Sequence, residues 1–160
     1  MALKHSNGDE QSSQAQLGGV SQVPATCMGL HIRRASRIIT QVYDAALRPV
    51  ELVVNQFTLL VSLHLFESVP ITRLAQELFV DQTTMTRNLK LLEKRGLVAI
   101  EPGADRRVRL ASLTPKGREI MMQAFPLWEQ AQITVQQQFG QQKSQTLLAL
   151  LADLTAISPS

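Results

Sequence analysis

The sequence predicts a mainly α-helical fold with one small β-hairpin, and three observations support this. Apolar residues recur with helical spacing in two long stretches, 27–47 and 115–157. Two shorter helical segments lie within residues 74–95 and are separated by a tight turn. Two strand-like runs, 97–100 and 108–113, flank a loop that contains Pro-Gly. Helix, turn, helix, strand, loop and strand in this order predict a winged helix-turn-helix with further helices on both sides.

Length and composition are those of one ordinary globular domain. The chain has 160 residues, of which 44% are hydrophobic and 4% aromatic, enough to bury a core. No apolar run approaches the ~18 residues that a membrane helix needs, and the first residues lack the apolar segment of a signal peptide. With a single cysteine the chain cannot form an internal disulfide. We therefore expect a cytoplasmic protein.

Positive charge is concentrated in the middle of the chain. Residues 71–118 carry ten basic and five acidic side chains, a net charge of +5 within a total of +3. Residues 1–70 are neutral, and residues 119–160 have a net charge of −2. This distribution favours a localised surface for a polyanion, although a solvated helix face would give the same count.

The first elements follow from composition and from proline. Residues 1–24 are rich in Gln, Ser and Gly without a period, which predicts a disordered tail. The helix that begins near Cys27 is ended by Pro49. A second helix is predicted over residues 55–66, and Pro70 breaks the chain before the next element.

The helix over residues 82–95 has clear signals at its start. It follows a short helix that ends near Phe79. Asp81 is placed to accept hydrogen bonds from the free N–H groups of the first turn. Val80 and Met85 stand at the two positions of a hydrophobic staple. The sequence therefore fixes where this helix begins.

The C-terminal part predicts a long helix and a shorter last one. Thr114 and Pro115 supply an N-cap and a first-turn proline, Pro126 is expected to kink the helix, and Gly140 ends it. The apolar side chains of these helices exceed what one winged domain can cover, so we expect a homodimer. The predicted parts are a tail (1–24), a dimerisation helix (25–52), the winged helix-turn-helix (53–114) and C-terminal dimerisation helices (115–160).

The helix over residues 82–95 suits the DNA major groove, which is ~12 Å wide. Glutamine can pair with adenine and arginine with guanine, while threonine can meet a thymine methyl or a phosphate. An ordinary solvated helix face is the alternative, but the strands that follow favour DNA contact. The predicted contact residues are Gln82, Thr83, Thr84, Thr86, Arg87 and Lys90.

The hairpin loop supplies a second predicted contact. Arg106 and Arg107 stand at its tip, and a narrow minor groove attracts guanidinium groups. Asp105 is placed to pair with one of these arginines and hold its rotamer. The alternative is a solvated loop tip, which we consider weaker for Arg107 than for Arg106.

Three segments resemble the MarR (multiple antibiotic resistance regulator) family: LHIRRASRIITQVYDAAL from Leu30, TTMTRNLKLLEKRGLV from Thr83 and DRRVRLASLTPKG from Asp105. The resemblance covers about Met28 to Ile157. It implies that the first and last helices form a dimer, that Arg107 enters the minor groove, and that Asp105 braces it.

Two positions depart from the family pattern. Val53 stands where the family often has a threonine at the start of the second helix, so that cap is expected from another residue such as Asn55. Cys27 lies two residues before Gly29, the position that aligns with the sensing cysteine of peroxide-responsive relatives. We therefore interpret Cys27 as a small, partly buried apolar residue rather than a sensor.

The resemblance also implies a site for an aromatic acid-like effector between the dimer helices and the winged domain. The candidate residues are His31, Tyr43, His64 and Trp128, each of which also suits a core or interface position. No cofactor or metal is expected, because the histidine, cysteine and acidic residues lack metal-ligand spacing.

The sequence thus predicts a homodimeric, ligand-responsive repressor that binds a pseudo-palindromic operator in double-stranded DNA, with half-sites about 34 Å apart. The alternative is a winged-helix module that binds protein and not DNA. An enzyme is not expected, because the sequence has no nucleophile–base pattern and no Gly-rich phosphate loop.

Overall fold

The computed structural model describes residues 19–157 and divides the chain into two compact units, residues 1–40 and 41–160. In the first unit, helix α2 (Val23–Thr26) precedes α3 (Met28–Leu47). Val23 and Pro24, the last residues of the predicted tail, begin α2, and Pro24 occupies its first turn, a position that proline favours. The predicted disorder of residues 1–18 lies outside the described residues.

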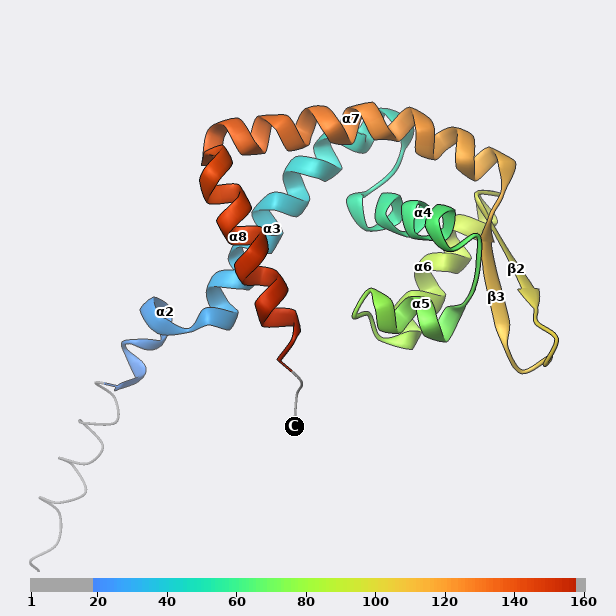
Figure 1. The fold of residues 1–160 in the computed structure, drawn as a ribbon, viewed down its shortest axis with the longest axis horizontal. Coiled ribbons are helices and arrows are strands. Elements are labelled where there is room, and N and C mark those ends of the chain that lie inside the picture. The colour runs from blue at the N-terminus through green and yellow to red at the C-terminus, as the bar shows by residue number, and fades with distance from the viewer. Residues whose placement is uncertain (1–18, 158–160) are drawn as a thin grey trace, which may run out of the picture. The chain divides into compact units, whose positions relative to one another are not determined.

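The second unit contains the winged helix-turn-helix that the sequence predicts (Figure 1). After the end of α3 and the 3₁₀ turn η1 (Arg48–Val50) come α4 (Val54–Phe66), β1 (Ser68–Pro70), α5 (Ile71–Glu77) and α6 (Gln82–Lys94). The wing strands β2 (Val98–Pro102) and β3 (Arg109–Leu113) follow, and then α7 (Pro115–Phe139) and α8 (Gln141–Thr155). The prediction of a mainly helical fold with a β-hairpin is confirmed.

The sheet has one strand more than the sequence predicts. β1 pairs antiparallel with β3, which also pairs with β2, so the strand order is β1-β3-β2. Val69 and Ile100 both lie opposite Ala111 in the ladder. Pro70, the predicted break, stands at the end of the short edge strand, where proline is tolerated.

The cap of α4 also differs from the prediction. Asn55 lies inside the helix, whose N-cap residue is Val53. Asp44 Oδ1 accepts a hydrogen bond from the Val54 N–H at 2.7 Å, and Gln56 Oε1 accepts one from the Val53 N–H at 3.3 Å. The missing threonine is therefore replaced by a carboxylate from α3 and an amide from the first turn.

The core lies among α4, α5, α6, the sheet and the first half of α7. Its largest fully buried side chains are Leu47, Leu60, Leu63, Val69, Leu74, Met85, Leu89, Leu92 and Leu97. Three of these come from one face of α6, which is thereby held against the rest of the domain. Burial of each such leucine contributes about 1.5–3 kcal/mol.

The two C-terminal helices leave large apolar side chains on the surface. α7 continues through Pro126 without a break, and the kink that the sequence predicts there stays a prediction. The exposed apolar residues of α7 and α8 include Met122, Phe125, Ile133, Phe139, Leu147, Leu148 and Leu150. Among the described residues no single helix is long and apolar enough to cross a membrane. α3 with η1 and α4 pass that test only as a pair bent by 73°, on length and composition alone.

Candidate nucleic-acid interface

The tight turn and the core fix the direction of α6. Phe79 in the turn has a positive φ of 51°, which lets the chain reverse between α5 and α6. Met85, Leu89 and Leu92 are each exposed by 1% or less. Because these three side chains face inward, the polar side chains between them face outward.

Asp81 caps α6 as the sequence predicts. Its Oδ1 accepts a hydrogen bond from the Thr84 N–H at 2.9 Å. The Thr84 hydroxyl and this N–H, together with the N–H of Thr83, hold the pKa of the Asp81 carboxyl below its ordinary value. The Thr84 side chain thus takes part in the N-cap of α6 by its contact with the Asp81 carboxyl.

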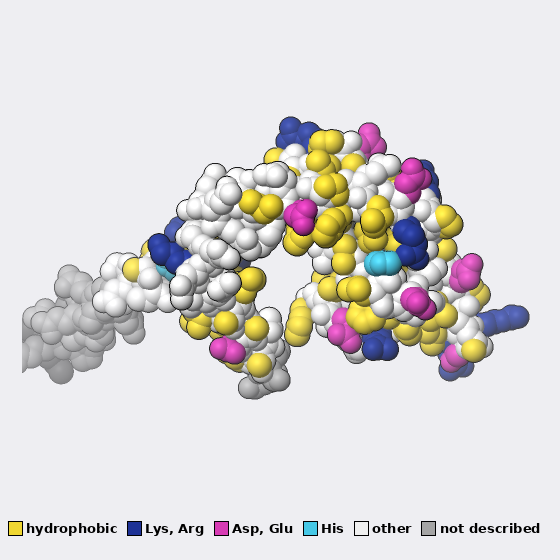
Figure 2. All heavy atoms as spheres, turned by 45° about the horizontal axis from the view of Figure 1, so that its top comes forward, with side chains coloured by type: hydrophobic (Ala, Val, Ile, Leu, Met, Phe, Trp, Pro, Cys, Tyr) yellow, Lys and Arg dark blue, Asp and Glu magenta, His cyan; other side chains and the backbone are white. Residues whose placement is uncertain are grey.

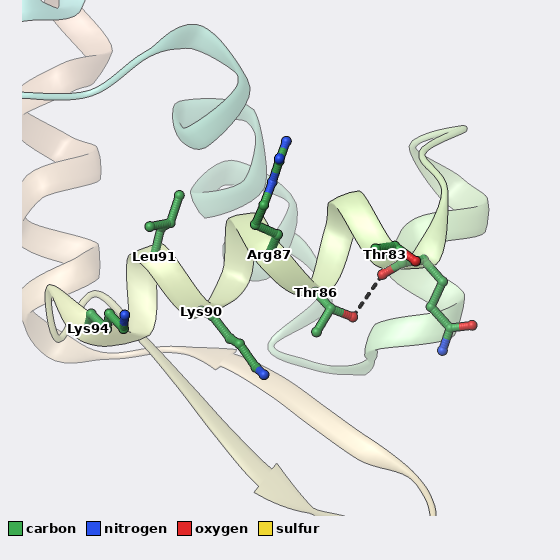
Figure 3. Close-up of a pocket in the computed structure, with 7 residues that line it drawn as sticks. Thr83, Thr86, Arg87, Lys90, Leu91 and Lys94 are labelled. Carbon is green, nitrogen blue, oxygen red and sulfur yellow. Dashed lines mark hydrogen bonds between the residues drawn. The ribbon is translucent and has the colours of Figure 1, made fainter.

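The outer face of α6 borders an open groove of about 640 Å³, which we call the recognition groove (Figure 3). It is lined by Gln82, Thr83, Thr86, Arg87, Lys90, Leu91 and Lys94. Five of these are predicted from the sequence, and the sixth predicted residue, Thr84, is absent from the lining. Leu91 and Lys94 were missed, although each lies four residues after a predicted contact, Arg87 and Lys90, and therefore on the same helix face.

The wing is a structured turn with its basic side chains exposed. The Gly103 N–H donates to the Val108 carbonyl at 2.8 Å, and the Val108 N–H donates to the Asp105 carbonyl at 2.9 Å. Arg106 and Arg107 at its tip are exposed. Figure 2 shows Lys and Arg side chains projecting at the end of the molecule where the β2–β3 hairpin lies.

Asp105 supports the wing through the backbone. Its Oδ1 accepts a hydrogen bond from the Arg107 N–H at 2.9 Å. The predicted pairing with an arginine side chain is not formed: within residues 19–157 the ion pairs are Arg73–Glu77 and Arg95–Glu51. Asp105 therefore orders the loop from which Arg107 projects and leaves the guanidinium free to contact a ligand.

Hydrogen bonds attach the carboxyl end of α6 to two neighbouring elements, and we call these bonds the α6 anchor. Arg95 Nη1 donates to the Glu51 carbonyl at 2.7 Å, next to η1. From the start of α7, Lys116 Nζ donates to the Arg95 carbonyl at 2.9 Å, and the Thr114 hydroxyl donates to the Gly96 carbonyl at 2.7 Å. The bonds from Lys116 and Thr114 satisfy carbonyls at the carboxyl end of α6, where a helix leaves its last carbonyls without a partner.

The candidate effector residues make separate contacts. The Tyr43 hydroxyl donates to Gln132 Oε1, and burial raises the pKa of Tyr43. Arg118 lies 2.8 Å from His64 Nδ1, and Trp128 packs against Phe57 with ring centroids 6.1 Å apart. In the first unit, His31 Nε2 lies 3.2 Å from the Ala25 carbonyl. The effector site therefore stays a prediction.

Residues 19–157 contain no group of three or more His, Cys, Asp or Glu residues placed to hold a metal ion. Cys27 is half-buried, as expected for a small apolar residue.

The Asp81 cap predicts a pH-dependent contribution to stability. Because the folded-state pKa is lowered, the stabilisation is present above the ordinary value of 3.8 and is lost as pH falls through the lowered value. We expect Asp81→Ala to lower Tm near neutral pH, while Asp81→Asn, which keeps an acceptor, retains most of the cap.

Thermal unfolding from about pH 7 to about pH 3 tests this expectation. The difference in Tm between the wild type and Asp81→Asn should shrink at the acidic end, where the carboxyl becomes protonated. A difference that stays constant over the whole range would contradict a charged cap.

The model of the MarR family matches residues 51–108. The structure of the M. tuberculosis transcriptional regulator MosR in complex with DNA is 35% identical and covers 82% of this chain and 99% of its own, with a TM-score of 0.69. A mutant form of MarR from E. coli, complexed with operator DNA, is 25% identical and covers 83% and 96%, with a TM-score of 0.75.

A curated protein also matches. It is the uncharacterized HTH-type transcriptional regulator YhbI of Bacillus subtilis (strain 168), which is 26% identical over 119 residues, 74% of this chain and 77% of YhbI. The named relatives are thus transcription regulators, and both of the structures named above contain DNA.

Proposed function

The chain belongs to the MarR family of winged helix-turn-helix transcription regulators, and from this we propose that it acts in the cytoplasm as a homodimeric, ligand-responsive repressor. It is a DNA-binding transcription regulator. In our proposal α6 enters the major groove and the wing enters the adjacent minor groove.

The composition of the recognition groove supports the proposal that α6 contacts DNA. The recognition groove contains three basic side chains, Arg87, Lys90 and Lys94, together with Gln82 and two threonines. Cations neutralise phosphates, while glutamine, arginine and threonine contact base edges. Because the core holds α6 by its opposite face, these groups are presented by a rigid helix. The exposed arginines of the wing, Arg106 and Arg107, add two further basic groups.

The salt dependence of binding tests this proposal. A DNA duplex selected by the full chain from a random pool should bind with an association constant that falls steeply as salt rises from about 50 to about 200 mM. The expected slope of log K against log salt is about −0.9 for each phosphate neutralised. Binding of a protein partner that depends weakly on salt, without binding of DNA, would favour the alternative of a protein-interaction module.

We propose that the dimer is formed by the terminal helices. Large apolar side chains are exposed on α3, α7 and α8, among them Ile38 (62%), Leu148 (59%) and Leu150 (56%). Exposed apolar surface of this extent is typical of an interface. In this proposal residues 25–52 and 115–160 pair across a two-fold axis, and residues 53–114 bind DNA.

Sedimentation should give twice the 17.7 kDa mass of the chain. Leu150→Glu, which places a charge in the proposed interface, should shift the protein toward the monomer. Lys143→Ala on the same helix changes an exposed polar residue and should leave the mass unchanged. A monomeric wild type at micromolar concentration would contradict the proposal.

A small aromatic acid-like effector remains part of the proposed function. Tyr43 is its best-supported candidate residue, because its half-buried hydroxyl lies where α3 meets α7 and would sense a ligand that displaces Gln132. Tyr43→Phe would then change the response to the effector without weakening DNA binding in its absence.

A further inference from the structure

Thr86 lies in the middle of the recognition groove. It stands four residues after Gln82 and four before Lys90, so the three side chains share one face of α6. The side chain is half-buried and lines the groove together with these two neighbours. Thr86 is therefore placed where a base edge would meet the helix.

The Thr86 hydroxyl is already used inside the helix. Its Oγ1 donates to the Gln82 carbonyl at 2.8 Å, a bond that threonine can make to the residue four positions earlier. Figure 3 shows the hydroxyl turned toward that carbonyl and the methyl group on the side of α6 from which Lys90 projects. Held in this way, Thr86 offers the groove a methyl group and not a hydrogen-bond donor.

We propose that the Thr86 methyl group reads a thymine by contact with its 5-methyl group, an inference that rests on the DNA binding proposed above. The 5-methyl of thymine is the apolar group among the donors and acceptors of the major groove. Arg87 and Lys90, which follow Thr86 in α6, supply cations for guanine or phosphate. Thr86 provides the apolar contact beside them and thereby distinguishes thymine from cytosine, which has no methyl at this place.

The first arm of the test uses the wild-type protein and modified DNA. An operator is selected by the full chain from random duplexes, and each of its thymines is replaced in turn by deoxyuridine, which lacks only the 5-methyl group. At one thymine in each half-site the replacement should weaken binding about fourfold, the effect of withdrawing one methyl group from an apolar contact. The other thymines should tolerate it.

The second arm uses two matched variants. Thr86→Val keeps the methyl group and removes the hydroxyl, so it should keep the deoxyuridine penalty at the same thymine. Thr86→Ser keeps the hydroxyl and removes the methyl, so it should lose about fourfold on the thymine operator and show no further penalty at that position.

Two results would overturn the inference while DNA binding stands. One is a deoxyuridine penalty in Thr86→Ser equal to that of the wild type at every thymine. The other is a loss of affinity in Thr86→Val with full affinity in Thr86→Ser, which would show that the hydroxyl is the reading group. If no duplex is enriched and binding is flat in salt, the proposed function fails and this inference fails with it.

Discussion

Arg107→Ala is expected to weaken operator binding by about 1–3 kcal/mol, a loss of roughly 5- to 150-fold in affinity. The side chain is exposed at the tip of the wing, and its backbone N–H is fixed by Asp105. Its guanidinium is therefore presented from an ordered loop, and a narrow minor groove binds such a group strongly. A gel-shift titration of the selected operator measures the loss.

Arg107→Lys distinguishes the contribution of the positive charge to DNA affinity from that of the planar guanidinium group. Lysine keeps the positive charge and lacks the planar guanidinium, so it should recover only part of the affinity. Lys143→Ala removes the same charge from α8, outside the recognition groove and the wing, and should change affinity by less than about twofold. Unchanged affinity in Arg107→Ala, at low and at physiological salt, would show that the wing does not contact DNA.

Gly117→Ala is expected to lower the free energy of unfolding by about 1–3 kcal/mol, and Tm by roughly 3–10 °C. A Cβ atom at Gly117 would lie 2.0 Å from the Leu97 carbonyl oxygen and 2.8 Å from Leu113 Cδ1. The first contact is with backbone, and the same carbonyl accepts the Thr114 N–H at 3.1 Å. The start of α7 must therefore move away from the strands, and thermal unfolding records the cost.

Gly29→Ala is the matched control, because both glycines lie in the first turn of a helix. A Cβ atom at Gly29 meets Arg33 Nη1 at 3.6 Å, an ordinary contact. Alanine favours helix over glycine by up to about 1 kcal/mol, so this variant should be as stable as the wild type or slightly more stable. Equal Tm values for Gly117→Ala and Gly29→Ala would contradict the close packing at Gly117.

Features that depend on near neighbours in the sequence could be predicted. The Asp81 cap follows from residues less than one turn apart. The same holds for the wing hairpin, whose turn is closed by bonds between Gly103, Asp105 and Val108. The helical period then places Gln82, Thr86 and Lys90 on one face, so most of the residues that line the recognition groove could also be predicted.

Features that depend on distant partners were missed. β1 is too short to show a period, and it is a strand because Val69 pairs with Ala111 more than forty residues later. The cap of α4 comes from Asp44, ten residues earlier on another helix. The hydrogen bond from the Arg107 N–H to Asp105 Oδ1 was also missed. Acidic and basic neighbours in a sequence suggest an ion pair between side chains, whether or not one forms.

The α6 anchor joins the start of α7 to the winged domain, and because the core holds α6 along its inner face, a rotation there would move α6 and the domain together. The helix has 13 residues and is therefore about 20 Å long, and its bonds to Glu51, Thr114 and Lys116 are all at the carboxyl end. A tilt of about 10° about that end would carry the amino end by about 3.4 Å, which is one base-pair step. A small rotation of the whole domain at the start of α7 would thus shift Gln82 and Thr83 by about one position along the DNA sequence.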